Sequence, residues 1–248
     1  MHTYSITDVG RLRAMNQDRF SNYFHPRFSL LLLADGMGGH NAGEVAASMA
    51  IEKTQDYLMA YKEREDYARL LTEAVQTANT AIYEEGKNVA EYRRMGTTIC
   101  CAVVAGDKLT IAHVGDSRIY LFRDRTLHQL TQDHSLVADL VRQGLLTPEE
   151  ALVHPDRNTL TRAVGTDPAI DVDTREIALA EGDRIMLCSD GLTKMVEDTA
   201  IASILGEQSN VRMACETLVE QAKNNGGADN ITITLYDIGD DHESDCAE

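Results

Sequence analysis

The sequence predicts an α+β fold in which antiparallel sheets are covered by pairs of helices. Apolar residues recur at helical spacing in two groups of adjacent segments, at 42–90 and again at 198–224. In a doubly wound parallel sheet, one helix would instead follow each strand. The adjacency of the helices therefore favours antiparallel sheets with helix pairs on their outer faces.

Three long helices are predicted. The first covers 42–61, and the other two follow from apolar residues spaced three and four positions apart, Leu71, Ala74, Val75, Ala78 and Ile82 in one and Val211, Ala214, Cys215, Leu218, Val219 and Ala222 in the other. A shorter helix should begin at Thr147-Pro148-Glu149-Glu150, which has the pattern of a capping box with proline at the first helical position. It belongs to a stretch, 135–165, that shows no strand pattern and could form a lid.

Strands are predicted from alternating or continuous apolar residues. Ile231, Ile233 and Leu235 alternate with Thr232, Thr234 and Tyr236, which is the period of a strand with one buried face. Further strands are expected at 28–34, 97–105, 109–114, 118–123 and 184–188. Ala105-Gly106-Asp107-Lys108 has the composition of a hairpin turn, and Gly115-Asp116 separates the next two strands.

The composition excludes several classes of function. A net charge of −17 over 248 residues disfavours nucleic-acid binding and attraction to anionic lipid. The charge indicates a solvated acidic surface, or carboxylates gathered around cations. No signal peptide is evident, and the longest apolar run, 30–34, is too short to cross a membrane. Five cysteines without CxxC spacing are expected to be reduced thiols of a cytoplasmic protein rather than a zinc site.

Three aspartates flank apolar strands. Asp35 follows 30–34, Asp190 follows 185–188, and Asp229 precedes the strand that begins at Ile231. Asp35 and Asp190 could each belong to a simple turn, because Asp-Gly is a common turn dipeptide. Together they would place oxygen ligands at the edge of one core, beside glycines that let the backbone turn and approach an ion. Such a set selects Mg²⁺ or Mn²⁺ over zinc or copper.

Six motifs resemble, in order, those of the PPM-type (protein phosphatase 2C-like) phosphatases, and most of all their stand-alone bacterial branch. They are Arg11-Leu12-Arg13-Ala14-Met15-Asn16-Gln17-Asp18, Asp35-Gly36-Met37-Gly38-Gly39-His40, Met95-Gly96-Thr97-Thr98, His113-Val114-Gly115-Asp116-Ser117-Arg118, Cys188-Ser189-Asp190-Gly191-Leu192 and Gly227-Ala228-Asp229-Asn230. The resemblance covers about residues 1–238. It implies one phosphatase domain with a four-layer αββα sandwich, two antiparallel sheets between helix pairs, and a flap at about 144–165. The acidic residues 239–248 are expected to form a disordered tail.

The resemblance also implies the metal ligands. Asp35 would bridge two divalent cations, Mn²⁺ or Mg²⁺. Asp190 and Asp229 would complete the ligands of one. The Gly36 carbonyl would bind the other, with Asp18 reaching it directly or through water. Asp116 and Asp190 would share a third, weaker cation, and Arg13 would grip the substrate phosphate.

The predicted chemistry is hydrolysis of a phosphate monoester. Two cations can hold a bridging water, lower its pKa and orient it for in-line attack. The sequence has no CxxxxxR loop of the cysteine phosphatases, so direct attack by water is favoured. The planar fork of Arg13 suits a phosphate, although a surface ion pair would explain that residue too.

The proton donor is left open by the sequence. Animal members of the family have a histidine after the Asp-Gly, where this chain has Met37. His40 could protonate the leaving oxygen, order a water, or serve only as a structural residue. His113 and His134 are interpreted as hydrogen-bonded structural residues, while hydrogen bonds from Thr97, Thr98 and Ser117 and an ion pair of Arg118 should fix the neighbouring aspartates.

The function predicted is that of a protein serine/threonine phosphatase. Its expected partners are phosphorylated proteins, including a cognate kinase, and not nucleic acid or a membrane, and the chain is expected to be a monomer. Two alternatives are a non-catalytic phosphate-sensing or scaffold protein on the same fold, and an unrelated acidic metal-binding module. The first alternative is disfavoured because such proteins usually lose metal ligands, and the set here is unbroken.

Overall fold

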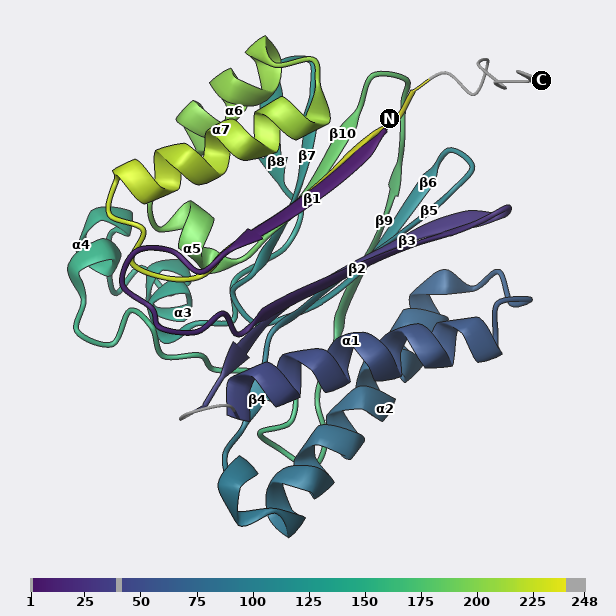
Figure 1. Cartoon of the computed structure of the whole chain (residues 1–248), viewed down its shortest axis with the longest axis vertical. Coiled ribbons are helices and arrows are strands. Elements are labelled where there is room, and N and C mark those ends of the chain that lie inside the picture. The colour runs from purple at the N-terminus through teal and green to yellow at the C-terminus, as the bar shows by residue number, and fades with distance from the viewer. Residues whose placement is uncertain (1, 39–41, 240–248) are drawn as a thin grey trace.

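The strands form two antiparallel sheets that face each other (Figure 1). The computed structural model describes residues 2–38 and 42–239. Its strands are β1 Thr3–Asp8, β2 Asp18–His25, β3 Phe28–Met37, β4 Gly96–Thr97, β5 Ile99–Ala105, β6 Lys108–Val114, β7 Arg118–Arg123, β8 Thr126–Gln129, β9 Asp173–Ala178, β10 Arg184–Cys188 and β11 Ile231–Asp237. One sheet has the order β1-β11-β10-β7-β8 and the other β2-β3-β5-β6-β9, with β4 paired to β3.

Helix pairs cover the two outer faces, as predicted. The helices α1 (Ala42–Ala60) and α2 (Tyr67–Asn88) pack on the sheet that contains β3 and β6. On the opposite side, α6 (Asp198–Glu207) and α7 (Val211–Asn224) pack on the sheet that contains β1 and β11 (Figure 1). The predicted four-layer α+β sandwich is therefore confirmed.

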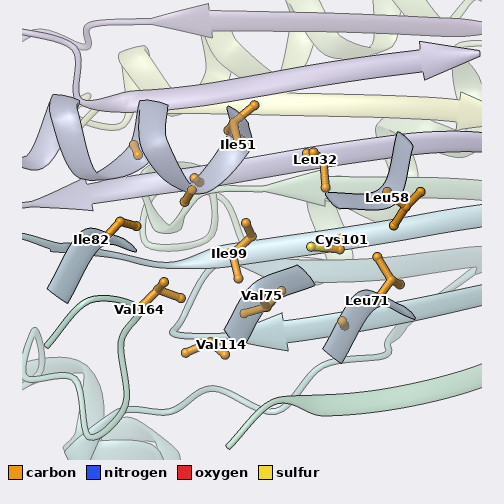
Figure 2. Packing of buried hydrophobic residues seen from close by; sticks show 14 of the residues in the cluster. Leu32, Ile51, Leu58, Leu71, Val75, Ile82, Ile99, Cys101, Val114 and Val164 are labelled. Carbon is orange, nitrogen blue, oxygen red and sulfur yellow. The ribbon is translucent and has the colours of Figure 1, made fainter. Parts of the chain in front are cut away.

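The period of two along the inner strands divides their side chains between separate cores. In β3, Leu30 and Leu32 join the cluster beneath α1 and α2, which Figure 2 shows, whereas Leu31 and Leu33 lie in the cluster between the sheets. Successive side chains of a strand point to opposite faces. Asp35 therefore continues the row that faces the other sheet.

The strand β11 is buried on both faces, so the predicted single buried face was wrong. Thr232 and Thr234 are fully buried and lie on the inner face of their sheet. Their hydroxyl groups bond to Thr7 at 2.7 Å and to Ser5 at 2.8 Å on the neighbouring strand β1. Hydroxyl groups that satisfy each other in this way can be buried without a large cost, which hydropathy alone does not reveal.

The strands β1, β2, β8 and β9 were not predicted, and they share one position: each is at an edge of its sheet. Edge strands are partly solvated, so they carry more polar residues and show a weaker apolar pattern than central strands. The strand β3 is also longer than predicted and includes Asp35 and Gly36, because it pairs with β4 beyond the apolar run.

The segment 135–165 contains α3 (Leu136–Arg142) and α4 (Pro148–Val153) and, as predicted, no extended strand. The capping box at the start of α4 is confirmed: Thr147 accepts a hydrogen bond from the Glu150 amide at 3.2 Å, and the Glu150 carboxylate accepts one from the Thr147 amide at 2.8 Å. Isolated bridges from Thr97 to Val164 and from Ser135 to Leu160 fasten the segment. Figure 1 shows α3 and α4 beside the short helix α5 (Asp190–Thr193), at one end of the sandwich.

None of the helices in the described part of the chain is both long and apolar enough to span a membrane. The predicted acidic tail lies, except for Gly239, outside the described residues.

Candidate metal centre

Aspartates from separate segments meet at the end of the sandwich where β3 and β10 end. A cleft of about 210 Å³ opens there. It is lined by Arg13, Gln17, Asp35, Gly36, Met37, Gly38, Thr98, Asp116, Asn158, Leu160, Asp190, Lys194, Asp229 and Asn230. Of the residues predicted for the site, Asp18 is buried next to Asp35, and His40 lies outside the described residues.

Asp18 opens β2 and is the direct cross-strand partner of Asp35 in β3. It is only 1% exposed. One of its oxygens, Oδ2, accepts hydrogen bonds from the hydroxyls of Ser189 and Thr232, both at 2.7 Å. The other, Oδ1, is buried without a hydrogen-bond partner among the described residues. One oxygen is therefore fixed in place, and the other is left for a ligand.

The backbone of Asp35 is held on both sides by threonines, as predicted. Its amide donates to Thr98 Oγ1 at 2.9 Å, and its carbonyl accepts from Thr97 Oγ1 at 2.8 Å. Thr98 Oγ1 also bonds to Ser117 Oγ at 2.7 Å. The hydroxyls thus connect Asp35 to the turn that carries Asp116.

Glycines beside two of the aspartates are required by close packing rather than by a turn. A Cβ atom on Gly36 would lie 2.0 Å from the Gly43 carbonyl oxygen, and one on Gly191 would lie 2.0 Å from the Asn230 carbonyl oxygen. Neither glycine has a positive φ. The expected role of glycine as a turn residue is therefore corrected at these positions: it lets α1 pack against β3 and lets Asp190 approach β11.

Asp116 lies where the chain crosses from one sheet to the other, between β6 and β7. Gly115 adopts φ +111° there, which favours glycine. The backbone of His134 donates to the Gly115 carbonyl at 2.8 Å, and its Nδ1 accepts from the Gly115 amide at 3.0 Å. His134 is thus the hydrogen-bonded structural residue that the sequence predicts, and it fixes the turn before Asp116.

His113 departs from the prediction. Neither of its ring nitrogens makes a hydrogen bond of normal geometry within the described chain, and its ring packs 4.8 Å from that of His134. Burial lowers the pKa of His113 to about 3. It is a neutral, buried ring in β6.

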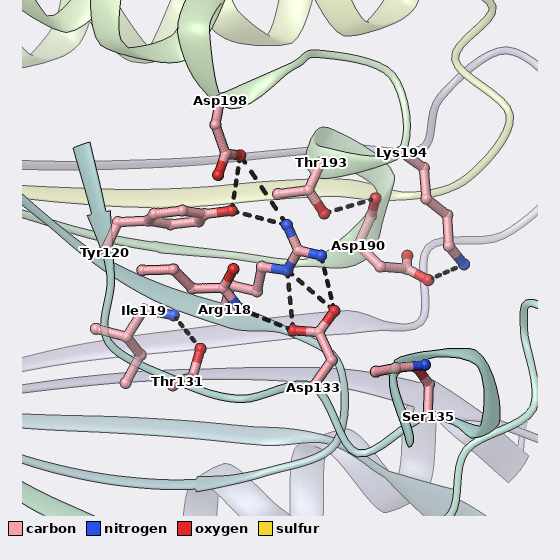
Figure 3. Close-up of polar contacts among 12 residues, drawn as sticks. Arg118, Ile119, Tyr120, Thr131, Asp133, Ser135, Asp190, Thr193, Lys194 and Asp198 are labelled. Atoms are coloured by element: carbon pink, nitrogen blue, oxygen red, sulfur yellow. Dashed lines mark hydrogen bonds and ion pairs between the residues drawn. The ribbon is translucent and has the colours of Figure 1, made fainter. Parts of the chain in front are cut away.

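Arg118 forms the predicted ion pair, with Asp133 as its partner. Its Nε and Nη2 contact the two carboxylate oxygens at 2.7–3.1 Å, and its Nη1 donates to Tyr120 at 2.9 Å (Figure 3). Asp133 immediately precedes His134. The pair therefore braces the same turn from outside the cleft.

Two cationic side chains pair with aspartates of the cleft. Arg13 donates to Asp229 Oδ2 at 2.7 Å, and Lys194 donates to Asp190 Oδ2. The predicted alternative for Arg13, a surface ion pair, thus describes the present structure, in which its side chain is 52% exposed. Asp190 Oδ1 is buried without a hydrogen-bond partner in the described chain. Within residues 2–38 and 42–239, no group of three or more acidic, histidine or cysteine side chains is arranged so that it could hold a metal ion.

Burial and mutual repulsion make the ionised carboxylates unfavourable. Burial raises the pKa of Asp18 to about 6, against the lowering by hydrogen bonds from Thr232 and Ser189. Burial, and then the charges of Asp18 and Asp190, raise the pKa of Asp35 well above its usual range. Burial and the charge of Asp190 raise the pKa of Asp116 to about 7. Crowded carboxylates with unsatisfied oxygens are a donor set that fits a hard divalent cation.

Asn230 has a role that the sequence analysis missed. Its Oδ1 accepts from the Gln17 amide at 2.9 Å, and its Nδ2 donates to the carbonyls of Val9 and Met15, both at 2.9 Å. One side chain therefore fixes the loop between β1 and β2, which carries Arg13 and leads to Asp18. Lys194 and Asn158 were also missed. For Lys194 the available signal was its position four residues after Asp190.

The chain is similar to known proteins along almost its whole length. The family model described as protein phosphatase 2C matches residues 11–231. The serine/threonine phosphatase stp of Listeria welshimeri is 38% identical, with 96% of each chain covered.

Solved structures extend the likeness to the fold. The serine/threonine phosphatase Stp1 of Staphylococcus aureus superposes with a TM-score of 0.91 at 36% identity, with 96% of this chain and 95% of that chain covered. The catalytic domain of the serine/threonine protein phosphatase PstP, determined in complex with two manganese ions, gives a TM-score of 0.83 at 38% identity, with 96% and 98% covered.

Proposed function

The chain belongs to the protein phosphatase 2C family and is a protein serine/threonine phosphatase, and from this premise we propose which of its residues carry out the hydrolysis. The observation that supports the proposal is the meeting of Asp18, Asp35, Asp190 and Asp229 at one end of the sandwich. They come from β2, β3, α5 and the loop before β11, so only the folded chain brings them together.

These aspartates are proposed to hold two divalent cations, Mn²⁺ or Mg²⁺, as metal binding is typical of the family and PstP was solved with two manganese ions. Asp35 would contribute to both cations, Asp190 and Asp229 would hold one of them, and the Gly36 carbonyl and Asp18 would hold the other. Asp116 and Asp190 would share a third, weaker cation. The unsatisfied Oδ1 atoms of Asp18 and Asp190 support this set. When bound, the cations supply a water of lowered pKa and positive charge for the phosphate.

Arg13 is proposed to bind the substrate phosphate. Its guanidinium lies at the cleft and is half exposed, so it can turn from Asp229 toward an incoming dianion. A planar fork with a permanent charge matches two phosphate oxygens. A cation that takes over Asp229 would also release Arg13 for this task.

A cysteine nucleophile is disfavoured. Cys100, Cys101, Cys188 and Cys215 are buried free thiols, and burial raises the pKa of Cys188 to about 12. These four thiols are therefore not available as thiolates near neutral pH. The phosphate ester is expected to be attacked directly by water, without a covalent enzyme intermediate.

His40 is proposed as the proton donor or as the residue that orders a water, from its place in the sequence alone.

Residues 1–238 are proposed to be one domain, with 144–165 as a flap beside the cleft. The protein is proposed to act as a cytoplasmic monomer on phosphorylated proteins, including a serine/threonine kinase. Buried free thiols suit a reducing compartment.

The test is hydrolysis of a phosphothreonine peptide by the purified protein. Activity should require Mn²⁺ or Mg²⁺, be lost with a chelator, and be lost in Asp190→Ala. A matched control is Asp107→Ala in the exposed β5–β6 hairpin, which should retain activity. Circular dichroism establishes that both variants are folded. Hydrolysis that persists without metal would refute the proposal.

A further inference from the structure

Lys194 places an ammonium group inside the acidic cleft. It follows α5 directly, four residues after Asp190, so its side chain reaches back along the same helix face (Figure 3). Its Nζ contacts Asp190 Oδ2 and donates to Asn158 Oδ1 at 2.8 Å. The side chain is 32% exposed. Lys194 thus joins a site aspartate to the segment between α4 and β9.

The ammonium lies among acidic side chains. Lys194 lines the same cleft as Asp116, Asp190 and Asp229. The ammonium therefore supplies positive charge among the carboxylates of the cleft.

We propose that Lys194 is a built-in counter-cation of the cleft, which competes with a divalent cation for Asp190 and holds the segment of Asn158 over the site. The inference rests on the proposed function, in which Asp116 and Asp190 share the weaker cation. Asp190 would serve the central pair of cations through Oδ1, which is unpaired in the described chain, so the weaker cation would need Oδ2, which cannot give its full interaction to both an ammonium and a metal ion. Binding of the metal ion should therefore expel Nζ and release Asn158.

Competition of this kind is a coupling between two sites, and such couplings are reciprocal. Any interaction that keeps Lys194 on Asp190 weakens binding of the metal ion to Asp190. A bound metal ion in turn weakens the contact between Lys194 and Asn158. Lys194 would then be a positioning residue that links occupation of the weaker cation site to the position of residues 154–160. The lysine need not touch the substrate for this.

Calorimetric titration with Mn²⁺ tests the competition. Wild type is compared with Lys194→Gln, Lys194→Arg and the control Lys87→Gln, which removes the same charge from the exposed end of α2. In Lys194→Gln the weakest Mn²⁺ site should tighten about fivefold or more. Lys194→Arg should keep the wild-type affinity of the weakest Mn²⁺ site because it keeps the charge. Lys87→Gln should change that affinity little. Identical titrations for wild type and Lys194→Gln would overturn the inference.

Hydrogen exchange tests the link to the segment. Without metal, the Thr159 amide, which donates to the Asp156 carbonyl, should exchange faster in Lys194→Gln and in Asn158→Ala than in wild type. Saturating Mn²⁺ should accelerate it in wild type and not in Lys194→Gln. Unchanged exchange of the Thr159 amide in both variants would refute the proposed link between Lys194 and the segment of Asn158.

The outcomes separate the two proposals. If wild type itself binds no Mn²⁺, the metal assignment fails and this inference fails with it. If wild type binds Mn²⁺ and Lys194→Gln binds it identically, the inference alone fails. A higher KM for phosphopeptide in Lys194→Gln, at unchanged metal affinity, would assign the ammonium to the substrate phosphate and likewise overturn it.

Discussion

Asp18 and Asp35 face each other directly across the β2–β3 pair, with no cationic side chain bonded to either carboxylate in the described chain. Like charges at such a position are destabilising, and burial makes them more so. This arrangement costs stability in the absence of a cation and favours binding of one.

The first prediction concerns the pH dependence of stability in metal-free protein. The pKa values of Asp18 and Asp116 rise on folding from 3.8 to about 6 and about 7. The folded protein therefore binds more protons than the unfolded chain between about pH 4 and 7. The contribution of these groups to the free energy of unfolding should fall as pH rises through that window.

Asp18→Asn isolates the effect. It removes the buried charge, so its free energy of unfolding relative to wild type should improve by about 2.4 kcal/mol between pH 4 and pH 8. Urea unfolding of chelator-treated protein measures it, with the exposed Asp107→Asn as control. A difference that is the same at both pH values would contradict the burial of an ionised Asp18.

The second prediction concerns Arg13. Replacement by alanine removes charge-assisted hydrogen bonds to the phosphate, each worth about 1.5–3 kcal/mol, so KM for a phosphopeptide should rise roughly tenfold to a hundredfold. Because Asp229 also loses its ion-pair partner, Mn²⁺ should bind more tightly. Steady-state kinetics and calorimetry measure the two effects. An unchanged KM would contradict the phosphate-binding role of Arg13 and leave only its surface ion pair with Asp229.

The third prediction separates the cations. Asp116→Ala should leave the two stronger Mn²⁺ sites filled, because Asp116 contributes to neither, yet reduce kcat by about tenfold to a hundredfold. Calorimetric stoichiometry and single-turnover kinetics are the readouts. Loss of the stronger sites together with the weaker one would show that Asp116 is part of the central pair.

The fourth prediction concerns packing beneath the site. Gly36→Ala would force a methyl group to 2.0 Å from the Gly43 carbonyl oxygen, so it should destabilise the fold by about 3 kcal/mol or more. Gly206→Ala in α6 meets nothing nearer than 3.4 Å and should stabilise by about 0.5 kcal/mol, since helical glycine is unfavourable. Thermal unfolding compares the two, and equal effects would contradict the close approach of α1 to β3.

The sequence by itself determined the helix pairs, the central strands and the family. Periodicity identifies 71–82 and 211–222 as helices because burial on one face imposes the 3.6-residue repeat. It identifies 28–34 and 184–188 as strands because both of their faces are buried. The edge strands β1, β2, β8 and β9 escaped because partial solvation weakens that pattern. The six ordered motifs indicated which aspartates matter.

Only the tertiary structure decided how the charges of the site are balanced. Arg13 meets Asp229 across 216 residues, and Lys194 meets Asn158 across 36. It also decided that Gly36 is needed for close packing and that Thr232 is an interior donor to Asp18. Such relations depend on which segments the two sheets bring face to face. Local sequence patterns do not predict these contacts, because burial and electrostatic energy are set by neighbours in space rather than by neighbours in sequence.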